Sequence, residues 1–432
     1  MSSPRGKDKE LAVVVLAAGE GTRMKSQLPK VLHPLCGRPL VDYVLEAARK
    51  LRPGRVIAVV RPGPDFDAYG GRADLVFQKE RRGTAHAVAQ AQSALKGFAG
   101  DVLVLSGDTP LLTTGTLRKL IRNHRNTGST ATLLTARLDG GRDYGRIVRG
   151  ADGSVERIVE AKDSTPAERN IQEVNSGTYV FRALDLFRAV GQVGTENRQA
   201  EFYLTDCIGI LKAQGRKIGG VAVDGDQEIA GINTRVDLAN AERTMRTRIN
   251  EGWMGKGVTL VDPNSTYIDS TVRMSADSVL HPFTFLHGRT RIGAGSTIGP
   301  MARVIDSDIG AGVTIENAVV MEARVADGAS IGPFSYLRPG SRIKAGAKVG
   351  TFVEIKKSEI GQGSKVPHLS YVGDAVIGKN VNVGAGSITC NYDGNAKAKT
   401  VIEDDAFIGS DTQLVAPVRV GKGAVTGAGS TI

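Results

Sequence analysis

Aromatic side chains are scarce in this 432-residue sequence, where phenylalanine, tyrosine and tryptophan together make up 5% and tryptophan occurs once. Glycine is abundant by contrast, with 54 residues. Few aromatics and many glycines indicate a repetitive β architecture in at least part of the chain. The length exceeds what one ordinary hydrophobic core organises, so we expect two or more domains.

Cysteine is also rare. Cys36, Cys207 and Cys390 are odd in number, far apart, and show neither a C-x-x-C pair nor the spacing of metal ligands. This pattern excludes a disulfide framework and a structural zinc site, and it predicts a reducing compartment.

No apolar run is long enough to span a bilayer. The charged start at 1–10 and the apolar run Leu11–Ala18 imitate a short signal peptide. That run has the minimal length of a signal core, however, and leads into Gly-Glu-Gly-Thr-Arg, not a small-x-small cleavage site. We therefore predict a cytoplasmic protein without a transmembrane segment.

Long basic runs are absent, although the formal net charge is +11. Such a charge suits nucleic acid, an anionic membrane surface or small polyanionic ligands. The sequence contains no nucleic-acid-binding signature and no basic helix with a broad apolar face. Phosphate-bearing small molecules are therefore the favoured partners and nucleic acid is not expected, while a basic solvated surface accounts for most of the charge in the simplest alternative.

The first half alternates short apolar runs with amphipathic stretches from Leu11 to about Asn233. Three segments read as buried strands, namely Leu11–Leu16, Arg55–Val60 and Val102–Leu105. Three others read as helices, namely Leu40–Leu51, Thr84–Leu95 and Thr116–His124. This alternation predicts a three-layer, Rossmann-like α/β domain with a mainly parallel sheet, which binds ligands at the carboxyl ends of its strands.

The hydrophobic period changes after this half. Between Val236 and Lys256 a single apolar stripe predicts a linker helix, formed by Leu238, Ala241, Met245 and Ile249. Beyond Gly257 aliphatic residues recur every six positions, in the registers Ile292, Ile298, Val304; Val325, Ile331, Leu337, Ile343, Val349; and Ile402, Ile408, Leu414, Val420, Ile432, with Thr426 interrupting the last.

A sustained six-residue period predicts a parallel β-helix of hexapeptide repeats, whose flat faces favour side-by-side oligomers. We thus expect a flexible N-terminus at 1–10, an α/β domain at 11–234, a linker helix at 235–257 and a β-helix at 258–432.

A glycine-containing loop follows the first predicted strand, running from Leu16 to Met24 and continuing to Pro29-Lys30. Its glycines let backbone N–H groups approach phosphate oxygens, and the N-terminus of a following helix favours anions. Arg23 and Lys30 add cations where charge builds during phosphoryl transfer. The loop departs from both G-x-G-x-x-G and the G-K-[ST] ending, so neither dinucleotide binding nor ATP hydrolysis is supported.

The loop resembles the signature L-x-x-G-x-G-T-x-M-x-x-x-x-P-K of sugar-1-phosphate nucleotidyltransferases at every fixed position. The resemblance implies nucleotide contacts from Leu16, Ala17, Ala18, Gly19, Lys30, Gln78, Gly83 and Thr84. It implies Mg²⁺ ligation by Asp108 and Asn233, and sugar binding by Gly145, Glu160 and Asn175. Taken singly, Asp108 could cap a helix or turn and Asn233 could be a turn residue. Gln78 could hydrogen-bond uracil or thymine, and the family match alone selects UTP. His86 is interpreted as structural.

The six-residue period is disturbed around Val366–Tyr371 and between Thr389 and Ile402, and interruptions of a solenoid are typical of functional loops. The first contains His368, which near basic residues on a rigid scaffold suits a general base. The second contains Cys390-Asn391-Tyr392-Asp393-Gly394, followed by Lys397.

Both halves together resemble the bifunctional N-acetylglucosamine-1-phosphate uridyltransferase/glucosamine-1-phosphate acetyltransferase family, with Ile388-Thr-Cys-Asn-Tyr-Asp-Gly394 the most specific stretch. The resemblance implies a left-handed β-helix, a homotrimer with acetyltransferase sites at subunit boundaries, and synthesis of UDP-N-acetylglucosamine for peptidoglycan and lipopolysaccharide from UTP and acetyl-CoA. It makes His368 the base for acetyl transfer and Asn391 the residue that orients the amine. It assigns the sugar phosphate to Arg338, Lys356, Tyr371, Asn382 and Lys397, acetyl-CoA to Ala385 and Ser410, and a lining position to Tyr392.

Two features depart from the family pattern. Pro367 precedes His368 where a small flexible residue is usual, and the sequence ends at Ile432 within the repeat, whereas the family continues with further coils and a basic tail that helps bind acetyl-CoA. We therefore expect the C-terminal tail to be missing.

Two other functions account for part of the pattern. One is a single-activity nucleotidyltransferase whose β-helix only assembles or regulates the oligomer, which would not require His368 together with the Asn391–Tyr392 loop. The other, a trimeric nucleic-acid-binding protein, rests on net charge alone.

Overall fold

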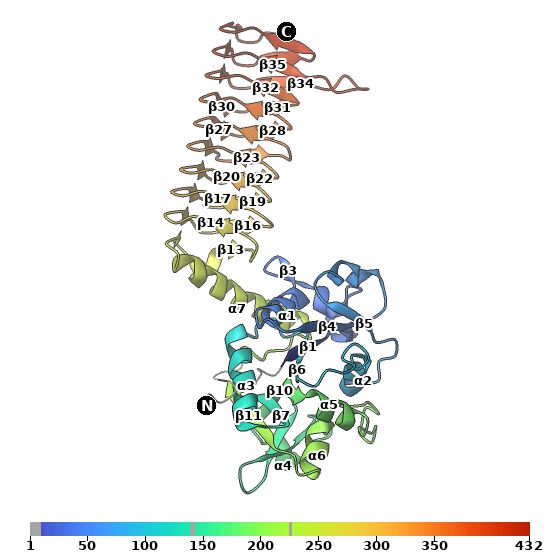
Figure 1. Cartoon of the computed structure of the whole chain (residues 1–432). Helices are drawn as coiled ribbons and strands as arrows, with labels where there is room; N and C mark the ends of the chain where they lie inside the picture. The colour runs from blue at the N-terminus through green and yellow to red at the C-terminus, as the bar shows by residue number, and fades with distance from the viewer. Residues whose placement is uncertain (1–9, 139–142, 224–226) are drawn as a thin grey trace, which may run out of the picture. The chain divides into compact units, whose positions relative to one another are not determined.

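The computed structural model describes residues 10–138, 143–223 and 227–432, and folds as two units that divide between Thr244 and Met245 (Figure 1). Each unit has a hydrophobic core of its own. Among the described residues no helix is both long and apolar enough to cross a membrane.

The first unit is built on a mixed sheet in the order β11-β7-β10-β6-β1-β4-β5, with β8 and β9 attached beside β10. β1 pairs in parallel with β4 and β6, whereas β10 is antiparallel to both β6 and β7. The strands are β1 (Leu11–Leu16), β4 (Arg55–Val60), β5 (Asp74–Phe77), β6 (Asp101–Ser106), β7 (Ala131–Arg137), β8 (Arg146–Arg149), β9 (Val155–Val159), β10 (Glu173–Arg182) and β11 (Ile218–Val223), with a separate two-stranded hairpin of β2 (Pro34–Leu35) and β3 (Arg38–Pro39).

Helices cover both faces of this sheet because its central strands are apolar on both sides. In β1 the side chains of Val13 and Val15 enter one core, while Ala12 and Val14 enter the other. The helices are α1 (Leu40–Arg49), α2 (Thr84–Gln90), α3 (Thr114–Thr127), α4 (Pro166–Arg169), α5 (Ala183–Val190), α6 (Asp206–Ala213) and α7 (Arg235–Met254), with 3₁₀ turns η1 (Thr22–Met24), η2 (Lys30–Leu32), η3 (Pro64–Tyr69) and η4 (Pro263–Ser265), the last in the second unit.

Several predicted segments differ in extent from those observed. The helix predicted at Leu40–Leu51 ends at Arg49, the one predicted at Thr116–His124 runs from Thr114 to Thr127, and the linker helix predicted at 235–257 ends at Met254. The strand predicted at Val102–Leu105 is longer by one residue at each end. The helix predicted at Thr84–Leu95 ends at Gln90, because i→i−3 hydrogen bonds replace the helical pattern from Ala91 onward.

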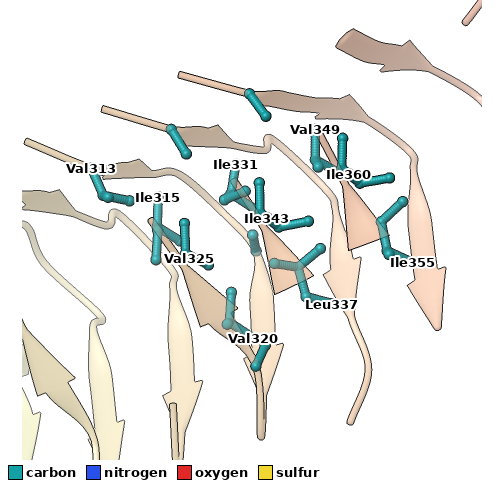
Figure 2. Packing of buried hydrophobic residues seen from close by; sticks show 14 of the residues in the cluster. Val313, Ile315, Val320, Val325, Ile331, Leu337, Ile343, Val349, Ile355 and Ile360 are labelled. Carbon is teal, nitrogen blue, oxygen red and sulfur yellow. The ribbon is translucent and has the colours of Figure 1, made fainter. Parts of the chain in front are cut away.

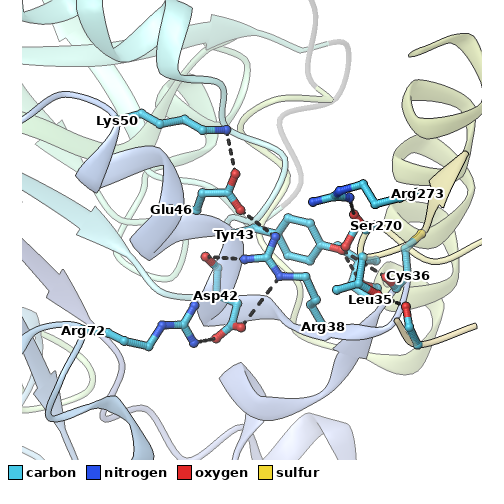
Figure 3. A network of polar contacts seen from close by, with 12 residues as sticks. Leu35, Cys36, Arg38, Asp42, Tyr43, Glu46, Lys50, Arg72, Ser270 and Arg273 are labelled. Carbon is cyan, nitrogen blue, oxygen red and sulfur yellow. Dashed lines mark hydrogen bonds and ion pairs between the residues drawn. The ribbon is translucent and has the colours of Figure 1, made fainter. Parts of the chain in front are cut away.

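A polar network fixes the hairpin β2–β3 against α1 (Figure 3). Arg38 contacts Glu46 at 2.6 Å and Asp42 at 3.7 Å, and the latter also accepts from Arg72 at 2.8 Å. Tyr43 Oη donates to Leu35 O at 2.7 Å. The hairpin follows the glycine-containing loop directly, so this network anchors the far end of the segment that carries Lys30.

The second unit winds three short strands per coil into three parallel sheets, and its coils are stacked in Figure 1. The first sheet holds β12 (Thr259–Leu260), β15 (Val279–Leu280), β18 (Thr297–Ile298), β21 (Thr314–Ile315), β24 (Ser330–Ile331), β27 (Lys348–Thr351), β30 (Lys365–His368), β33 (Asn382–Val383) and β36 (Phe407–Ile408). The second holds β13 (Tyr267–Ile268), β16 (Phe285–His287), β19 (Arg303–Ile305), β22 (Val319–Met321), β25 (Tyr336–Leu337), β28 (Glu354–Lys356), β31 (Tyr371–Gly373), β34 (Ile388–Cys390) and β37 (Gln413–Val415). The third holds β14 (Arg273–Met274), β17 (Arg291–Ile292), β20 (Asp308–Ile309), β23 (Arg324–Val325), β26 (Arg342–Ile343), β29 (Glu359–Ile360), β32 (Ala375–Ile377), β35 (Thr400–Ile402) and β38 (Val418–Val420).

The six-residue period is the distance from one sheet to the next around a coil. Val325, Ile331 and Leu337 lie on β23, β24 and β25, which belong to three different sheets. All three side chains are buried and stack on the equivalent residues of neighbouring coils (Figure 2). The fold confirms the predicted class, a Rossmann-like domain followed by a left-handed β-helix of hexapeptide repeats.

The three edges between the sheets differ in chemistry. The edge between the first and second sheets, called here the apolar edge, carries exposed apolar residues with left-handed backbone, namely Phe283, Met301, Phe334, Phe352 and Leu369, and the partly exposed Asn317. The edge between the second and third sheets is polar and charged, with Asp306, Glu322, Lys357 and Asp374. The third edge is mostly glycine, at Gly295, Gly312, Gly328, Gly346 and Gly363.

One of the two predicted interruptions is wrong. Val366 and Val372 are both buried and still six residues apart, so β30 and β31 continue the coil without a loop. The disturbance lay in the residue types Pro367 and His368, not in the spacing. The second interruption is confirmed, because residues 391–399 leave the stack next to β34 in Figure 1.

Candidate functional sites

The loop after β1 is shaped by Gly21, whose φ is +66°. A Cβ at this position would lie 2.5 Å from Lys30 Cβ, so a side chain is excluded there. Gly19 has no heavy atom within 4 Å of its Cβ position, which leaves open space beside the loop. The helix expected to follow is a single 3₁₀ turn, η1, because Gly21 and Lys25 at its two ends both adopt left-handed backbone. A helix dipole therefore contributes little here, and the features of the loop that favour an anion are its backbone N–H groups and nearby cations.

Three predicted residues from distant parts of the sequence meet beside this loop. Lys30 Nζ donates to Asn233 Oδ1 at 3.0 Å and forms an ion pair with Asp108. The Lys30 and Asp108 side chains are 12% and 16% exposed, and Ser106 Oγ donates to the Asp108 carboxylate at 2.6 Å. Burial acts to raise the pKa of Asp108, but the Lys30 ammonium and these hydrogen bonds outweigh it and hold the pKa below its usual value. The carboxylate is thus kept ionised at the carboxyl end of β6.

The oxygens around Lys30 Nζ suit a divalent cation. Asp108 and Asn233 present a carboxylate and an amide oxygen, the hard donors that Mg²⁺ prefers alongside phosphate oxygens. A positive group already lies between them, since Lys30 Nζ bonds to both. The donor set therefore fits the metal that the sequence predicted.

Gln78, Gly83 and Thr84 lie close together in the first unit, next to residues 202–204. Gln78 is 5% exposed, and its Nε2 donates to Gly83 O at 3.3 Å and lies 3.0 Å from His86 Nδ1. A Cβ on Gly83 would lie 2.4 Å from Phe202 O, so glycine is required where this loop meets 202–204. Thr84 Oγ1 accepts from Leu204 N at 2.9 Å. His86 positions Gln78, in keeping with its structural interpretation.

Gly145, Glu160 and Asn175 lie together on β8, β9 and β10 or directly beside them. Asn175 N donates to Gly145 O at 2.8 Å, and a Cβ on Gly145 would lie 3.5 Å from Glu160 Oε2. Thr205 Oγ1 donates to Glu160 Oε1 at 3.1 Å. Burial raises the pKa of Glu160, and the nearby carboxylates Asp206, Asp163 and Glu201 add to the shift. These groups form a compact polar surface.

Arg23 lies apart from Lys30. Its side chain is 58% exposed and lies 3.6 Å from the Asp143 carboxylate. Both residues line a cavity of about 570 Å³ that also includes Tyr144 and Asn233. Arg23 is thus the exposed cation of the two, whereas Lys30 is mostly buried and bonded to two side chains.

In the second unit, Lys356, Tyr371 and Asn391 converge around Gly373. A Cβ on Gly373 would lie 2.4 Å from Tyr371 Oη and 2.8 Å from Asn391 Nδ2. Lys356 pairs with Gly373 across β28 and β31, and its Nζ lies 3.5 Å from Asp374 Oδ2. Because Gly373 has no side chain, the three polar groups can approach one another above its backbone.

Two further cations lie next to this cluster. The Lys356 and Lys397 amines lie next to each other; this contact raises the pKa of Lys356, and the same contact with charge repulsion lowers the pKa of Lys397. Arg338 precedes Lys356 by one coil, and its Nη1 donates to Glu354 Oε1 at 2.8 Å. The cluster is basic overall, which suits a phosphate.

His368 lies elsewhere on the coil, at the end of β30 beside Leu369 of the apolar edge. Its side chain is exposed, and within the part of the chain that the structure describes it forms no hydrogen bond or ion pair. Continuing the register of Lys365 with Asn382 and of Asn382 with Phe407 places Ala385 and Ser410 on the next two coils; Asp411 N donates to Ala385 O at 2.7 Å. His368, Ala385 and Ser410 thus form one column, separate from the Lys356 cluster.

Tyr392 and Asn382 belong neither to the Lys356 cluster nor to the column that contains His368. Tyr392 is 59% exposed on the 391–399 loop, where its Oη donates to Gly394 O at 2.5 Å. Asn382 lies within β33 of the first sheet.

Two neighbours of the cluster were missed from sequence, Asp374 and Glu354. Acidic residues recur at coil edges, so no local signal separated Asp374 from Asp306, and Glu354 was overlooked although it follows Arg338 by about one coil.

Comparison with known proteins adds two family matches. Residues 13–199 match the family described as MobA-like NTP transferase domain, and residues 399–432 match bacterial transferase hexapeptide (six repeats). Curated relatives carry the name bifunctional protein GlmU. One from Brevibacillus brevis is 48% identical over 98% of this chain and 92% of its own length, and one from Pelotomaculum thermopropionicum is 52% identical over 95% and 90%. A third, from Heliobacterium modesticaldum, is 48% identical over 97% and 92%.

Proposed function

The chain belongs to the family of bifunctional GlmU enzymes, which join a nucleotidyltransferase to an acetyltransferase, and on this premise we propose the substrates, metal and residues of each half. Acetyl-CoA acetylates glucosamine-1-phosphate in the second unit. UTP then uridylylates N-acetylglucosamine-1-phosphate in the first unit, and pyrophosphate is released. The reactions take place in the cytoplasm.

In the first unit a phosphate oxygen of the sugar phosphate attacks the α-phosphorus of UTP, and the bond to the β-phosphate breaks. Lys30 and Arg23 stabilise the charge that builds on the phosphates, and the open space beside Gly19 admits them. Gln78, with Gly83 and Thr84, reads the uracil. The sugar lies against Gly145, Glu160 and Asn175.

Asp108 and Asn233 would hold Mg²⁺, which neutralises phosphate charge and fixes the phosphate geometry when bound. Lys30 Nζ bonds to the same two side chains, so the ammonium and a metal ion would compete for their oxygens. Lys30 is therefore free to turn toward the phosphates only when another cation takes its place.

In the second unit His368 removes a proton from the amine of glucosamine-1-phosphate while the nitrogen attacks the thioester carbonyl. The carbon–sulfur bond breaks and coenzyme A leaves as the thiol, taking up a proton. Asn391 orients the amine, and the sugar phosphate is held by Arg338, Lys356, Tyr371, Asn382 and Lys397. Acetyl-CoA lies along Ala385 and Ser410, and Tyr392 lines the site.

We propose further that the enzyme is a homotrimer. The apolar edge supports this, since Phe334 and Phe352 are more than half exposed and stack at 5.2 Å on a rigid scaffold. His368 adjoins this edge, so a neighbouring subunit packed there would bring a second wall to the His368 column.

The observation that carries the proposal is that each unit assembles its own polar cluster from predicted residues: Lys30 with Asp108 and Asn233, and Lys356 with Tyr371 and Asn391. The test compares two variants. Asp108→Ala should abolish pyrophosphate release from UTP and leave thiol release from acetyl-CoA intact, and His368→Ala should do the reverse. Loss of both activities in one folded variant would contradict separate sites. If the unmodified chain shows no thiol release, and adding a family C-terminal tail does not restore it, a β-helix that only assembles the oligomer would be favoured.

A further inference from the structure

Asp374 occupies the turn from β31 to β32, with a left-handed φ of 52°. Its N–H donates to Lys356 O at 3.0 Å, and its carbonyl accepts from Thr400 N at 3.4 Å. The carboxylate is 22% exposed and therefore sits at the rim of the Lys356 cluster. Bonds to the coils on both sides fix the turn, so the carboxylate has a defined position.

The carboxylate fixes the orientation of the Asn391 amide. Asn391 Nδ2 donates to Asp374 Oδ2 at 2.5 Å, and the Asn391 residue is 8% exposed. A carboxylate only accepts hydrogen bonds, so the amide nitrogen must face it and the amide oxygen must face away. Asn391 Oδ1 forms no hydrogen bond within the described chain. A free acceptor of this kind matches an N–H of a neutral amine.

The same carboxylate oxygen lies 3.5 Å from Lys356 Nζ. Lys356 also contacts Lys397, so two amines share one carboxylate. A negative charge at this place keeps Lys356 protonated and directed at the cluster, where a sugar phosphate would bind.

We infer that Asp374 is a positioning residue for acetyl transfer, whose carboxylate turns the Asn391 oxygen toward the substrate amine and holds Lys356 toward the phosphate. This inference rests on the proposed roles of Asn391 and Lys356. Asp374 itself need not touch substrate.

The test uses the full chain with two substitutions chosen for the backbone. Asp374→Gly removes the carboxylate and tolerates positive φ, whereas Asp374→Asn keeps an acceptor for Asn391 Nδ2 but loses the charge. Asp306→Gly is the matched control, because Asp306 lies on the same edge with φ of 44° and its carboxylate accepts from Arg289 N instead. Uridylyl transfer and the mass of the oligomer are measured on every preparation.

We expect Asp374→Gly to lower kcat for acetyl transfer about 10- to 100-fold, the effect of losing a hydrogen bond to a charged group. KM for glucosamine-1-phosphate should rise, while KM for acetyl-CoA stays within about twofold. Asp374→Asn should recover most of kcat and keep the raised KM. Adding Asp374→Gly to Asn391→Ala should lower kcat no further.

Two results would overturn the inference. One is an Asp374→Gly enzyme whose kcat stays within twofold while Asn391→Ala is impaired, and the other is Asp374→Asn as damaged in kcat as Asp374→Gly. If Asn391→Ala and Lys356→Ala both leave acetyl transfer unchanged, the proposed site itself is wrong, which is a different outcome.

Discussion

The two units build polar clusters in opposite ways. In the first, Lys30, Asp108 and Asn233 come from segments up to 203 residues apart, and the fold brings them into contact within one chain. In the second, Lys356, Tyr371 and Asn391 reach one another because they occupy adjacent coils. An α/β domain can enclose a ligand site within one chain. The surface of a β-helix can line only one side of such a site.

This difference shows in which groups are left without partners. The Lys30 side chain is mostly buried and bonded to both neighbours, but the His368 side chain is exposed and forms no hydrogen bond or ion pair within the described chain. From this contrast we propose that the first site is complete in a single chain and that the second is completed by a neighbouring subunit.

The largest effect is expected at the apolar edge. Replacing both Phe334 and Phe352 with Asp places two charges in the proposed subunit interface, and should dissociate the proposed trimer and lower acetyl transfer more than about 1,000-fold. Uridylyl transfer should stay within about twofold. Light scattering and the two assays measure this.

The matched control is Gly346→Asp, which puts a charge on another edge with the same left-handed backbone and open space for a side chain. It should leave both activities and the mass unchanged. A dissociated double variant that keeps acetyl transfer would contradict the need for a neighbour.

A smaller effect is expected in the first site from Lys30→Met. Loss of the ammonium should slow uridylyl transfer about 100- to 1,000-fold, as for other charge-stabilising groups. Binding of Mn²⁺ to the free enzyme, followed by electron paramagnetic resonance, should tighten, because no cation competes for Asp108 and Asn233. Lys25→Met, an exposed change in the same loop, should alter neither. Weaker Mn²⁺ binding in Lys30→Met would show that the ammonium does not occupy the metal position.

The smallest effect concerns the stability of the first unit. Burial raises the pKa of Glu160, so between its ordinary and raised pKa the folded chain keeps a proton that the unfolded chain releases. Folding stability therefore falls as pH rises through that range. Glu160→Gln should raise the melting temperature at pH 8 by about 2 °C or more, and by less at pH 5, while impairing sugar binding.

Calorimetry measures this change, and Glu156→Gln on the exposed side of β9 is the control. A Glu160→Gln chain that melts lower at pH 8 than the unmodified one would contradict the sign.

The sequence predicted most of the architecture because each half repeats a simple period. The hydrophobic pattern alone was enough to predict the strand at Leu11–Leu16 and the inward-facing residues Val325, Ile331 and Leu337. Family resemblance supplied Asp108 and Asn233, and the structure brings both to Lys30. The prediction of a loop at Val366–Tyr371 was wrong. Pro367 and His368 are unusual residue types for the repeat, and from sequence alone they resemble a break in the six-residue spacing.

Contacts across coils could not be predicted either. The role of Asp374 depends on its distance from Asn391, and that distance is set by how two coils stack, not by any neighbouring residue in the chain. The single turn at η1 depends likewise on backbone geometry at Gly21 and Lys25.

The most direct test of two separate sites in one chain is a mixing experiment with glucosamine-1-phosphate, acetyl-CoA, UTP and Mg²⁺. Asp108→Ala alone and His368→Ala alone should each form no UDP-N-acetylglucosamine. Their mixture should form it, because the acetylated sugar phosphate diffuses from one variant to the other. A mixture as inactive as either variant alone, or product from one variant by itself, would contradict the account.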